Sequence, residues 1–204
     1  MRSADMAVAR IKAINFTAKC YWVVEGDIKG FFDNIDHNVM IESLWQIGIR
    51  DKRILSIIKQ MLKAGVMDEC ETSELGTPQG GIISPLLANI YLNRFDRFIT
   101  GDFERKKLRR TYSRSDGRLQ AMRKHSKLKT AYYVRYADDW VILTDNKEDA
   151  ERLKYKAKRY LRDTLKLELS EEKTLITNVT SRPIKFLGVE IKMDVRNGRL
   201  VNKV

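Results

Sequence analysis

Apolar and polar residues follow one another in patterns that predict strands and helices. Residues 19–32 begin with a β-branched and aromatic run that ends at Asp27, which predicts a buried strand followed by a glycine-containing turn. Asp36 is typical of a helix N-cap, and apolar residues recur behind it at helical spacing up to Gly48. Residues 19–48 therefore predict a strand followed by a helix.

The same patterns continue along the rest of the chain. A second helix is predicted over residues 51–65, with Asp51 as its cap and Gly65 as its stop. The remaining predicted elements are a Gly- and Pro-rich loop at 75–85, a helix at 86–99, two strands within 131–145, an amphipathic helix at 146–167, and strands of period two at 171–179 and 184–193, which form a hairpin or a sheet edge.

Composition narrows the class of protein. A chain of 204 residues with 43% hydrophobic residues can bury the core of one domain or one compact lobe, which excludes a disordered chain. The net charge of +12 favours a polyanionic partner such as nucleic acid. An anionic membrane surface is the alternative, but no basic amphipathic helix dominates and no apolar run reaches membrane-spanning length. Cys20 and Cys70 have no zinc spacing and predict reduced thiols of an intracellular protein.

Two adjacent carboxylates, Asp138 and Asp139, lie inside the apolar run AYYVRYADDWVILTD. Successive residues of a strand point to opposite faces, so in mid-strand one of the two would be buried without a partner. The conflict disappears if both lie at the tip of a hairpin, from which they can project together. Two like charges held together favour a hard divalent cation. The alternative is an Asp pair that is simply solvated in a turn.

A third acid strengthens the metal interpretation. Asp27 ends its own predicted strand, and if that strand lies beside the hairpin, three carboxylates meet at one end of a sheet. Three acids can hold two metal ions about 3.5–4 Å apart, the separation used for in-line phosphoryl transfer. The alternative for Asp27 alone is a strand-terminal cap.

Five motifs, in order, resemble a reverse transcriptase: DIKGFFDNIDH, GTPQGGIISPLLANIYLNRFD, YADD, LELSEEKT and FLGVEI. The amino-acid sequences of these motifs are similar to those of the group II intron-encoded enzymes, which also act as RNA splicing factors (maturases). The resemblance covers about residues 2–192. It implies an α+β fold, a ferredoxin-like polymerase palm with interleaved partial fingers. Fingers would occupy roughly 35–82 and the palm the flanking segments. We expect a fragment that lacks the thumb.

The resemblance also implies the residues of a polymerase site. Asp27, Asp138 and Asp139, with the backbone carbonyl of Ile28, match the ligands of two Mg²⁺ ions, for which Mn²⁺ is a possible substitute. Phe32 matches the aromatic gate that excludes a ribose 2′-hydroxyl, with the neighbouring Phe31 as the weaker candidate. Ordinary core packing is the alternative for this Phe pair.

Further matches concern the nucleotide and the primer. Gln79 matches a contact to the sugar and base of the dNTP, and Gly80 lets the backbone approach it; the alternative is a Gly/Pro turn without a ligand. Lys173 matches a lysine near the leaving pyrophosphate, a possible general acid, with a solvated surface lysine as the alternative. The hairpin that grips the primer matches Phe186, Leu187 and Gly188, for which a plain β-hairpin is the alternative.

Residues 101–130 form a basic insertion. From Asp102 to Lys129 it carries 11 Lys and Arg residues against three acids, which favours neutralisation of RNA phosphates over a merely solvated loop. His125 is interpreted as part of this surface and His37 as a helix-start residue. The candidate RNA contacts are Arg105, Lys106, Lys107, Arg109, Arg110, Arg123 and Lys124.

Two functions of different classes follow from the resemblance. The first is RNA-directed DNA polymerisation with intron RNA, an RNA template, a DNA primer and dNTPs as partners. The second is a maturase that binds intron RNA without chemistry. A metal-dependent nuclease could use similar acids, but it would not need the Phe32 gate. We expect an intracellular protein, in the bacterial cytoplasm or in an organelle, with a homodimer possible and no membrane partner.

Overall fold

The computed structural model describes residues 3–63, 75–77, 82–101, 111–114, 117, 120, 131–194 and 199–203. The chain divides into two compact units. The first contains residues 1–27, 97–157 and 170–204, and the second contains residues 28–96 and 158–169. Each unit is described by itself below.

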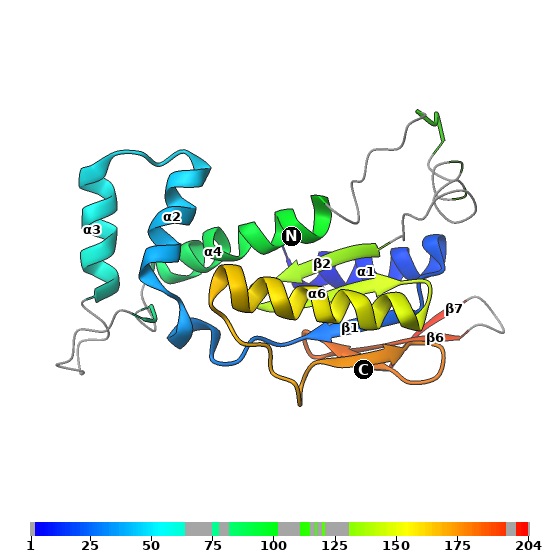
Figure 1. The fold of residues 1–204 in the computed structure, drawn as a ribbon. Helices are drawn as coiled ribbons and strands as arrows, with labels where there is room; N and C mark the ends of the chain where they lie inside the picture. The colour runs from blue at the N-terminus through cyan, green and yellow to red at the C-terminus, as the bar shows by residue number, and fades with distance from the viewer. Residues whose placement is uncertain are drawn as a thin grey trace. The chain divides into compact units, whose positions relative to one another are not determined.

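A four-stranded antiparallel sheet forms the centre of the first unit (Figure 1). Its strands are β1 (Trp22–Gly26), β2 (Ala131–Tyr136), β3 (Asp139–Thr144) and β4 (Leu175–Asn178), in the order β2-β3-β1-β4. Helix α6 (Lys147–Leu165) joins β3 to β4 and continues into the second unit. This order, with helices in the β1–β2 and β3–β4 connections, is that of a ferredoxin-like palm, so the predicted α+β fold is confirmed.

Helix α1 (Ala4–Ala18) covers one face of this sheet and was not predicted. The Ser3 hydroxyl caps it by accepting a hydrogen bond from the Met6 amide at 3.2 Å. Its buried side chains pack into one core with Val23, Val141 and Leu143 of the sheet. Val24 and Ile142 alternate with these residues and are buried on the opposite face of the sheet. Figure 1 shows α6 crossing this sheet.

A second, three-stranded sheet completes the first unit. It contains β5 (Ile184–Phe186), β6 (Val189–Asp194) and β7 (Arg199–Lys203), in that order. The single strand predicted at 184–193 is instead two strands, β5 and β6, and it forms no hairpin with the strand at 171–179, because β4 belongs to the other sheet. The hairpin implied by the match at Phe186–Gly188 is present between β5 and β6, and β7 was not predicted. Ile184, Phe186, Ile191 and Met193 alternate along the two strands and enter the same core as α1.

The second unit contains the 3₁₀ helix η1 (Phe31–Asn34), α2 (His37–Ile47), α3 (Lys52–Lys63) and most of α4 (Ser84–Ile99). The predicted caps are confirmed. Asp36 accepts hydrogen bonds from the Asn38 and Val39 amides, and Asp51 accepts one from the Arg53 amide. Gly48 ends α2 with a φ of 108°, which only glycine adopts readily. Gly65 lies outside the described residues.

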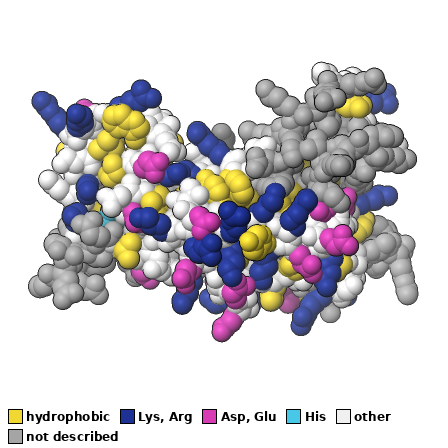
Figure 2. Space-filling model, viewed as in Figure 1, with side chains coloured by type: hydrophobic (Ala, Val, Ile, Leu, Met, Phe, Trp, Pro, Cys, Tyr) yellow, Lys and Arg dark blue, Asp and Glu magenta, His cyan; other side chains and the backbone are white. Residues whose placement is uncertain are grey.

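Mixed charge covers α6. Figure 2 shows Lys and Arg side chains interspersed with Asp and Glu over the region of this helix, and the pairs Lys147–Glu151 and Arg159–Asp163 lie at 3.6 and 3.5 Å. The helix therefore presents a solvated face of both signs. Within the described ranges, no helix combines the length and apolar character that crossing a membrane would require.

Candidate functional site

The acid pair lies at the tip of the β2–β3 hairpin, as the strand pattern predicted. The two strands pair antiparallel up to Tyr136 opposite Asp139, which leaves Ala137 and Asp138 as a two-residue turn. Ala137 has a φ of 54°, in the left-handed region. Such values are usual in two-residue hairpin turns. Asp138 therefore belongs to the turn, and Asp139 is the first residue of β3.

Asp27 reaches the same end of the sheet from a distant part of the sequence. Strand β1 lies between β3 and β4, and its last residue, Gly26, pairs with Trp140. Because the strands are antiparallel, the residue after Gly26 lies level with the residue before Trp140. The register thus places Asp27 beside Asp139. The backbone of Asp27 is held from the β4 side, where its carbonyl accepts a hydrogen bond from the Ser170 amide at 2.9 Å.

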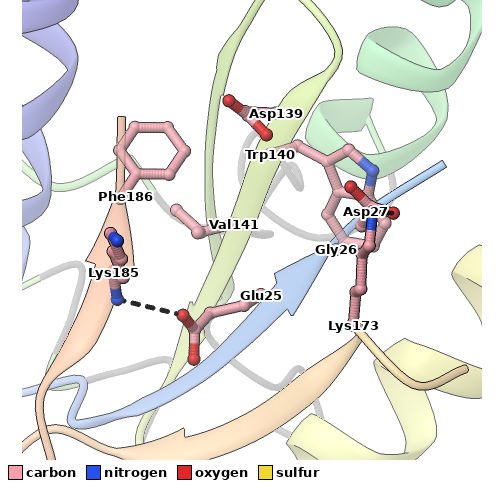
Figure 3. Close-up of a pocket in the computed structure, with 9 residues that line it drawn as sticks. All are labelled: Glu25, Gly26, Asp27, Asp139, Trp140, Val141, Lys173, Lys185 and Phe186. Carbon is pink, nitrogen blue, oxygen red and sulfur yellow. Dashed lines mark hydrogen bonds and ion pairs between the residues drawn. The ribbon is translucent and has the colours of Figure 1, made fainter. Parts of the chain in front are cut away.

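A pocket of about 140 Å³ opens between these acids and the β5–β6 hairpin (Figure 3). Asp27 and Asp139 line it, whereas Asp138 does not. The lining residues are Glu25, Gly26 and Asp27 from β1 and its end, Asp139, Trp140 and Val141 from β3, Lys173 from the turn before β4, and Lys185 and Phe186 from β5. The pocket therefore combines the acidic end of one sheet with the first strand of the other.

Three negative charges lie close together at this end of the sheet. Burial raises the pKa of Asp139, and the negative charges of Asp138 and Asp27 raise it further. Lys173 supplies a positive charge, with its Nζ 3.7 Å from Oδ2 of Asp27. The carboxylates thus repel each other, and a cation placed among them would relieve the repulsion.

The donor set fits a hard divalent ion, because carboxylate oxygens are the ligands that Mg²⁺ prefers. Across the described ranges, however, no three His, Cys, Asp or Glu side chains are close enough to share one metal ion. Ile28 follows Asp27 but belongs to the second unit, where it forms a β-bridge with Leu169. The metal-binding roles of Asp27, Ile28, Asp138 and Asp139 stay predictions.

The Phe pair lies in η1 of the second unit. Phe31 is 3% exposed and packs edge-on against Phe32 and Tyr91. Phe32 is less buried, so it is the member of the pair that retains more accessible surface. The structure therefore assigns core packing to Phe31 and leaves the gate role of Phe32 as a prediction.

The segment that leads to the predicted nucleotide loop is held against η1 and α2. The Thr77 amide donates to the Phe32 carbonyl at 2.9 Å, and the Gly76 amide donates to the Ile35 carbonyl at 2.8 Å. His37 is the first residue of α2, as predicted, and its buried ring donates from Nε2 to the Gly76 carbonyl at 2.7 Å. His37 therefore starts α2 and also binds the segment at Gly76 to that helix.

Several predicted residues lie outside the described part of the chain. These are Gln79 and Gly80 of the nucleotide loop, Cys70, His125, and the basic residues Arg105, Lys106, Lys107, Arg109, Arg110, Arg123 and Lys124. Cys20 is buried with a free thiol.

The predicted primer grip occupies the β5–β6 turn. Phe186 is 3% exposed and closes one side of the pocket, and Leu187 and Gly188 form the turn with φ values of 51° and 79°. Lys173, predicted within a strand, lies instead in a turn, because β4 begins only at Leu175. The contacts to primer and pyrophosphate stay predictions.

Five pocket residues were missed by sequence reasoning: Glu25, Gly26, Trp140, Val141 and Lys185. Burial raises the pKa of Glu25, and hydrogen bonds from the Thr177 hydroxyl and the Lys185 amide, together with the charge of Arg182, partly offset that rise. An available signal was an acid inside the apolar run YWVVEG, where an ionised group needs partners.

Comparisons with known proteins show which family the chain resembles. Residues 1–191 match the family described as "Reverse transcriptase (RNA-dependent DNA polymerase)". The chain is 38% identical to the group II intron-encoded protein LtrA of Lactococcus lactis subsp. cremoris over 94% of this chain and 38% of that protein. It is 35% identical to protein YkfC of Escherichia coli over 82% of this chain and 46% of that protein. The chain thus spans less than half the length of these relatives.

A solved structure shows the same fold at low sequence identity. Apo telomerase from Candida tropicalis, truncated from its C-terminal domain, aligns with a TM-score of 0.59 and 16% identity, over 98% of this chain and 39% of that chain. The likeness concerns the fold alone.

Proposed function

Because the chain belongs to the reverse transcriptase (RNA-dependent DNA polymerase) family, we propose that it is the finger and palm part of an RNA-directed DNA polymerase of a mobile group II intron. The observation that carries this proposal is the meeting of Asp27 and the Asp138–Asp139 hairpin tip at one sheet end, next to the β5–β6 hairpin. A protein that only binds RNA has no need for clustered carboxylates beside a polyanion.

The reaction is nucleotidyl transfer. The primer 3′-hydroxyl loses its proton to water as its oxygen forms a bond to the α-phosphorus of a dNTP. The bond from that phosphorus to the bridging oxygen breaks, and pyrophosphate leaves with its electron pair. The carboxylates of Asp27, Asp138 and Asp139, with the Ile28 carbonyl, would hold two Mg²⁺ ions. When bound, these ions would supply activation of the attacking hydroxyl and charge stabilisation at the leaving oxygen.

Other residues bind and orient the substrates in this proposal. Lys173 carries a proton that it can give to the leaving pyrophosphate. Phe32 excludes a ribose 2′-hydroxyl by shape, and Gln79 and Gly80 contact the incoming dNTP. Phe186, with the Leu187–Gly188 turn, contacts the primer end.

The partners are intron RNA, an RNA template, a DNA primer and dNTPs. The relative LtrA is named as a group II intron-encoded protein, which supports an intron as the source of the RNA. Such a polymerase has to work where its RNA is made, in the bacterial cytoplasm or in an organelle. The proposal includes a homodimer, which sedimentation of the natural protein tests.

Primer extension on an RNA template with dNTPs and Mg²⁺ tests the polymerase proposal. The whole natural protein, its Asp138→Ala variant and a matched control, Glu148→Ala, are compared, with RNA affinity recorded for each. Glu148 is an exposed acid in the first turn of α6. We expect extension by the parent and the control, and loss of extension with unchanged RNA affinity in Asp138→Ala. Equal extension by all three proteins would contradict the proposal.

The second candidate is a maturase that supports splicing by binding RNA without polymerisation. It is favoured by the net charge of +12 and by the basic insertion at 101–130. The charge reversals Arg109→Glu and Arg110→Glu should weaken RNA binding and splicing more than extension on a short template. Lys156→Glu with Lys158→Glu on α6 is the control. Lost extension at unchanged RNA affinity would overturn this division of roles, and tight binding without extension by the parent would favour the maturase.

A further inference from the structure

An acidic residue, Glu25, lies inside the four-stranded sheet. Strand β1 is flanked on both sides, and Glu25 pairs with Val141 of β3 and Leu175 of β4. Its side chain is partly buried and lines the pocket. An acid at such a position costs stability unless its oxygens find partners. Its partners therefore indicate why it is there.

The two carboxylate oxygens of Glu25 bind two different strands. Oε1 accepts a hydrogen bond from the Thr177 hydroxyl of β4 at 2.9 Å. Oε2 accepts one from the Lys185 backbone amide of β5 at 3.2 Å, the contact drawn as a dashed line in Figure 3. Thr177 belongs to the same sheet as Glu25, whereas Lys185 belongs to the other sheet. One side chain thus connects the two sheets.

The position of β5 explains why this contact is needed. In the three-stranded sheet β5 is an end strand, with β6 on one side. Backbone amides on the free side of an end strand need acceptors from elsewhere. Glu25 supplies such an acceptor to Lys185, and a charged acceptor makes a stronger hydrogen bond than a neutral one.

The contact lies between the two parts of the site. Glu25 precedes Asp27 by two residues on the same strand segment. Lys185 directly precedes Phe186, and the Leu187–Gly188 turn follows. We propose that Glu25 is a positioning residue that fastens the β5–β6 hairpin to the strand leading to Asp27, through Thr177 and the Lys185 amide. Its functional consequence rests on the proposed polymerase function: Glu25 sets where the primer end lies relative to the acids.

Two substitutions separate positioning from chemistry. Glu25→Ala removes both acceptors. Glu25→Gln keeps an oxygen for the Lys185 amide and offers an N–H that the Thr177 hydroxyl can accept, so it should restore the contact. A third variant, Thr177→Val, keeps the carboxylate and removes one of its donors. The control is Glu190→Ala, an exposed acid on β6 of the same hairpin.

The first readout is hydrogen exchange of the backbone amides of β5 in the whole natural protein, which needs no polymerase activity. Glu25→Ala should speed exchange at Lys185 by roughly tenfold or more, as expected for loss of a hydrogen bond to a charged group. Glu25→Gln and Glu190→Ala should leave it within about threefold of the parent. Unchanged exchange in Glu25→Ala would overturn the proposal. If that variant does not fold, Thr177→Val decides, because faster exchange at Lys185 is expected there too.

The second readout is steady-state primer extension with the primer–template and the dNTP varied separately. Glu25→Ala should raise KM for primer–template several-fold and leave KM for dNTP unchanged. Glu25→Gln should have the KM values of the parent. A loss of folded protein would lower kcat alone. If Glu25→Gln is as inactive as Glu25→Ala while Lys185 stays protected, the carboxylate acts chemically and the positioning role is wrong. If the parent itself does not extend primers, the polymerase proposal fails and the exchange readout still decides the contact.

Discussion

The indole ring of Trp140 occupies the space beside the α-carbon of Gly26 into which any side chain would project. The two residues are paired across β1 and β3, and a β-carbon at position 26 would overlap the six-membered part of the Trp140 ring. Trp140 is 1% exposed and follows Asp139 directly, while Gly26 directly precedes Asp27. The close contact therefore sets the separation of the two strands where the acids lie.

Gly26→Ala should destabilise the first unit by about 1–3 kcal/mol, because the ring has to leave a well-packed position. Primer extension should fall as well, since Asp139 moves with Trp140. Thermal unfolding and extension assays on the parent and the variant measure both effects. Gly101→Ala is the control, because no described atom lies within 4 Å of a β-carbon there.

The double variant Gly26→Ala with Trp140→Leu tests the cause of that loss. A smaller side chain at 140 makes room for the new methyl group, so the two substitutions should be less damaging together than their separate effects predict. Strictly additive effects would show that the Gly26–Trp140 contact is not the cause.

Asp139→Asn should raise the melting temperature of the protein in the presence of a chelator while abolishing primer extension. The folded state raises the pKa of Asp139 above its ordinary value of 3.8, through burial and then through Asp138 and Asp27. A raised pKa means that ionisation of Asp139 destabilises the folded state. The increase in melting temperature of Asp139→Asn should therefore be present near neutral pH and vanish below about pH 3.8. Melting temperatures measured from about pH 3 to pH 8 test this. A lower melting temperature at neutral pH would contradict the repulsion.

Lys173→Gln should increase the affinity of the site for a divalent cation by about two- to fivefold, the range expected for an exposed ion pair. The Lys173 ammonium lies 3.7 Å from Asp27 and competes with a cation for that carboxylate. Titration with Mn²⁺ followed by electron paramagnetic resonance measures the affinity. Lys154→Gln is the control, since its ammonium faces Glu171 and the Thr174 carbonyl instead. If Lys173 also donates a proton to pyrophosphate, kcat should fall although the cation binds more tightly.

Asp36→Ala should cost about 1 kcal/mol of stability near neutral pH, because the N-cap of α2 is lost. Burial opposes ionisation of Asp36, but hydrogen bonds from Lys166 and the Val39 amide and the charge of Lys166 outweigh it, so its pKa lies below the ordinary 3.8. A lowered pKa stabilises the fold above that pH, and the contribution disappears as the pH falls through the folded-state pKa.

Urea unfolding at about pH 7 and about pH 3 tests this prediction, with Asp36→Asn as the matched variant. Asn can still cap the helix but cannot form the 2.7 Å ion pair with Lys166. Asp36→Asn should therefore lose less free energy of unfolding than Asp36→Ala. Equal losses for Asn and Ala would show that the cap contributes little.

Sequence reasoning succeeded where the physical cause is local. The caps Asp36 and Asp51 and the stop at Gly48 satisfy backbone groups within a few residues, so they can be identified from neighbours alone. The hairpin tip at Asp138 followed from a similar consideration, because alternation within a strand excludes two adjacent acids on one face. Helix α1 was equally local, with buried residues at helical spacing, and was overlooked rather than unpredictable.

The pocket itself depends on contacts between residues far apart in the chain. Asp27 meets Lys173, Gly26 meets Trp140, and Glu25 meets Thr177 and the Lys185 amide. No local pattern encodes these pairs, because they require the strand order β2-β3-β1-β4 and, for Lys185, the docking of β5 beside β1. The amino-acid sequence by itself determined the type of chemistry, through its acids and their motifs. Only the tertiary structure decided which side chains hold those acids in place, since their partners are chosen by sheet register.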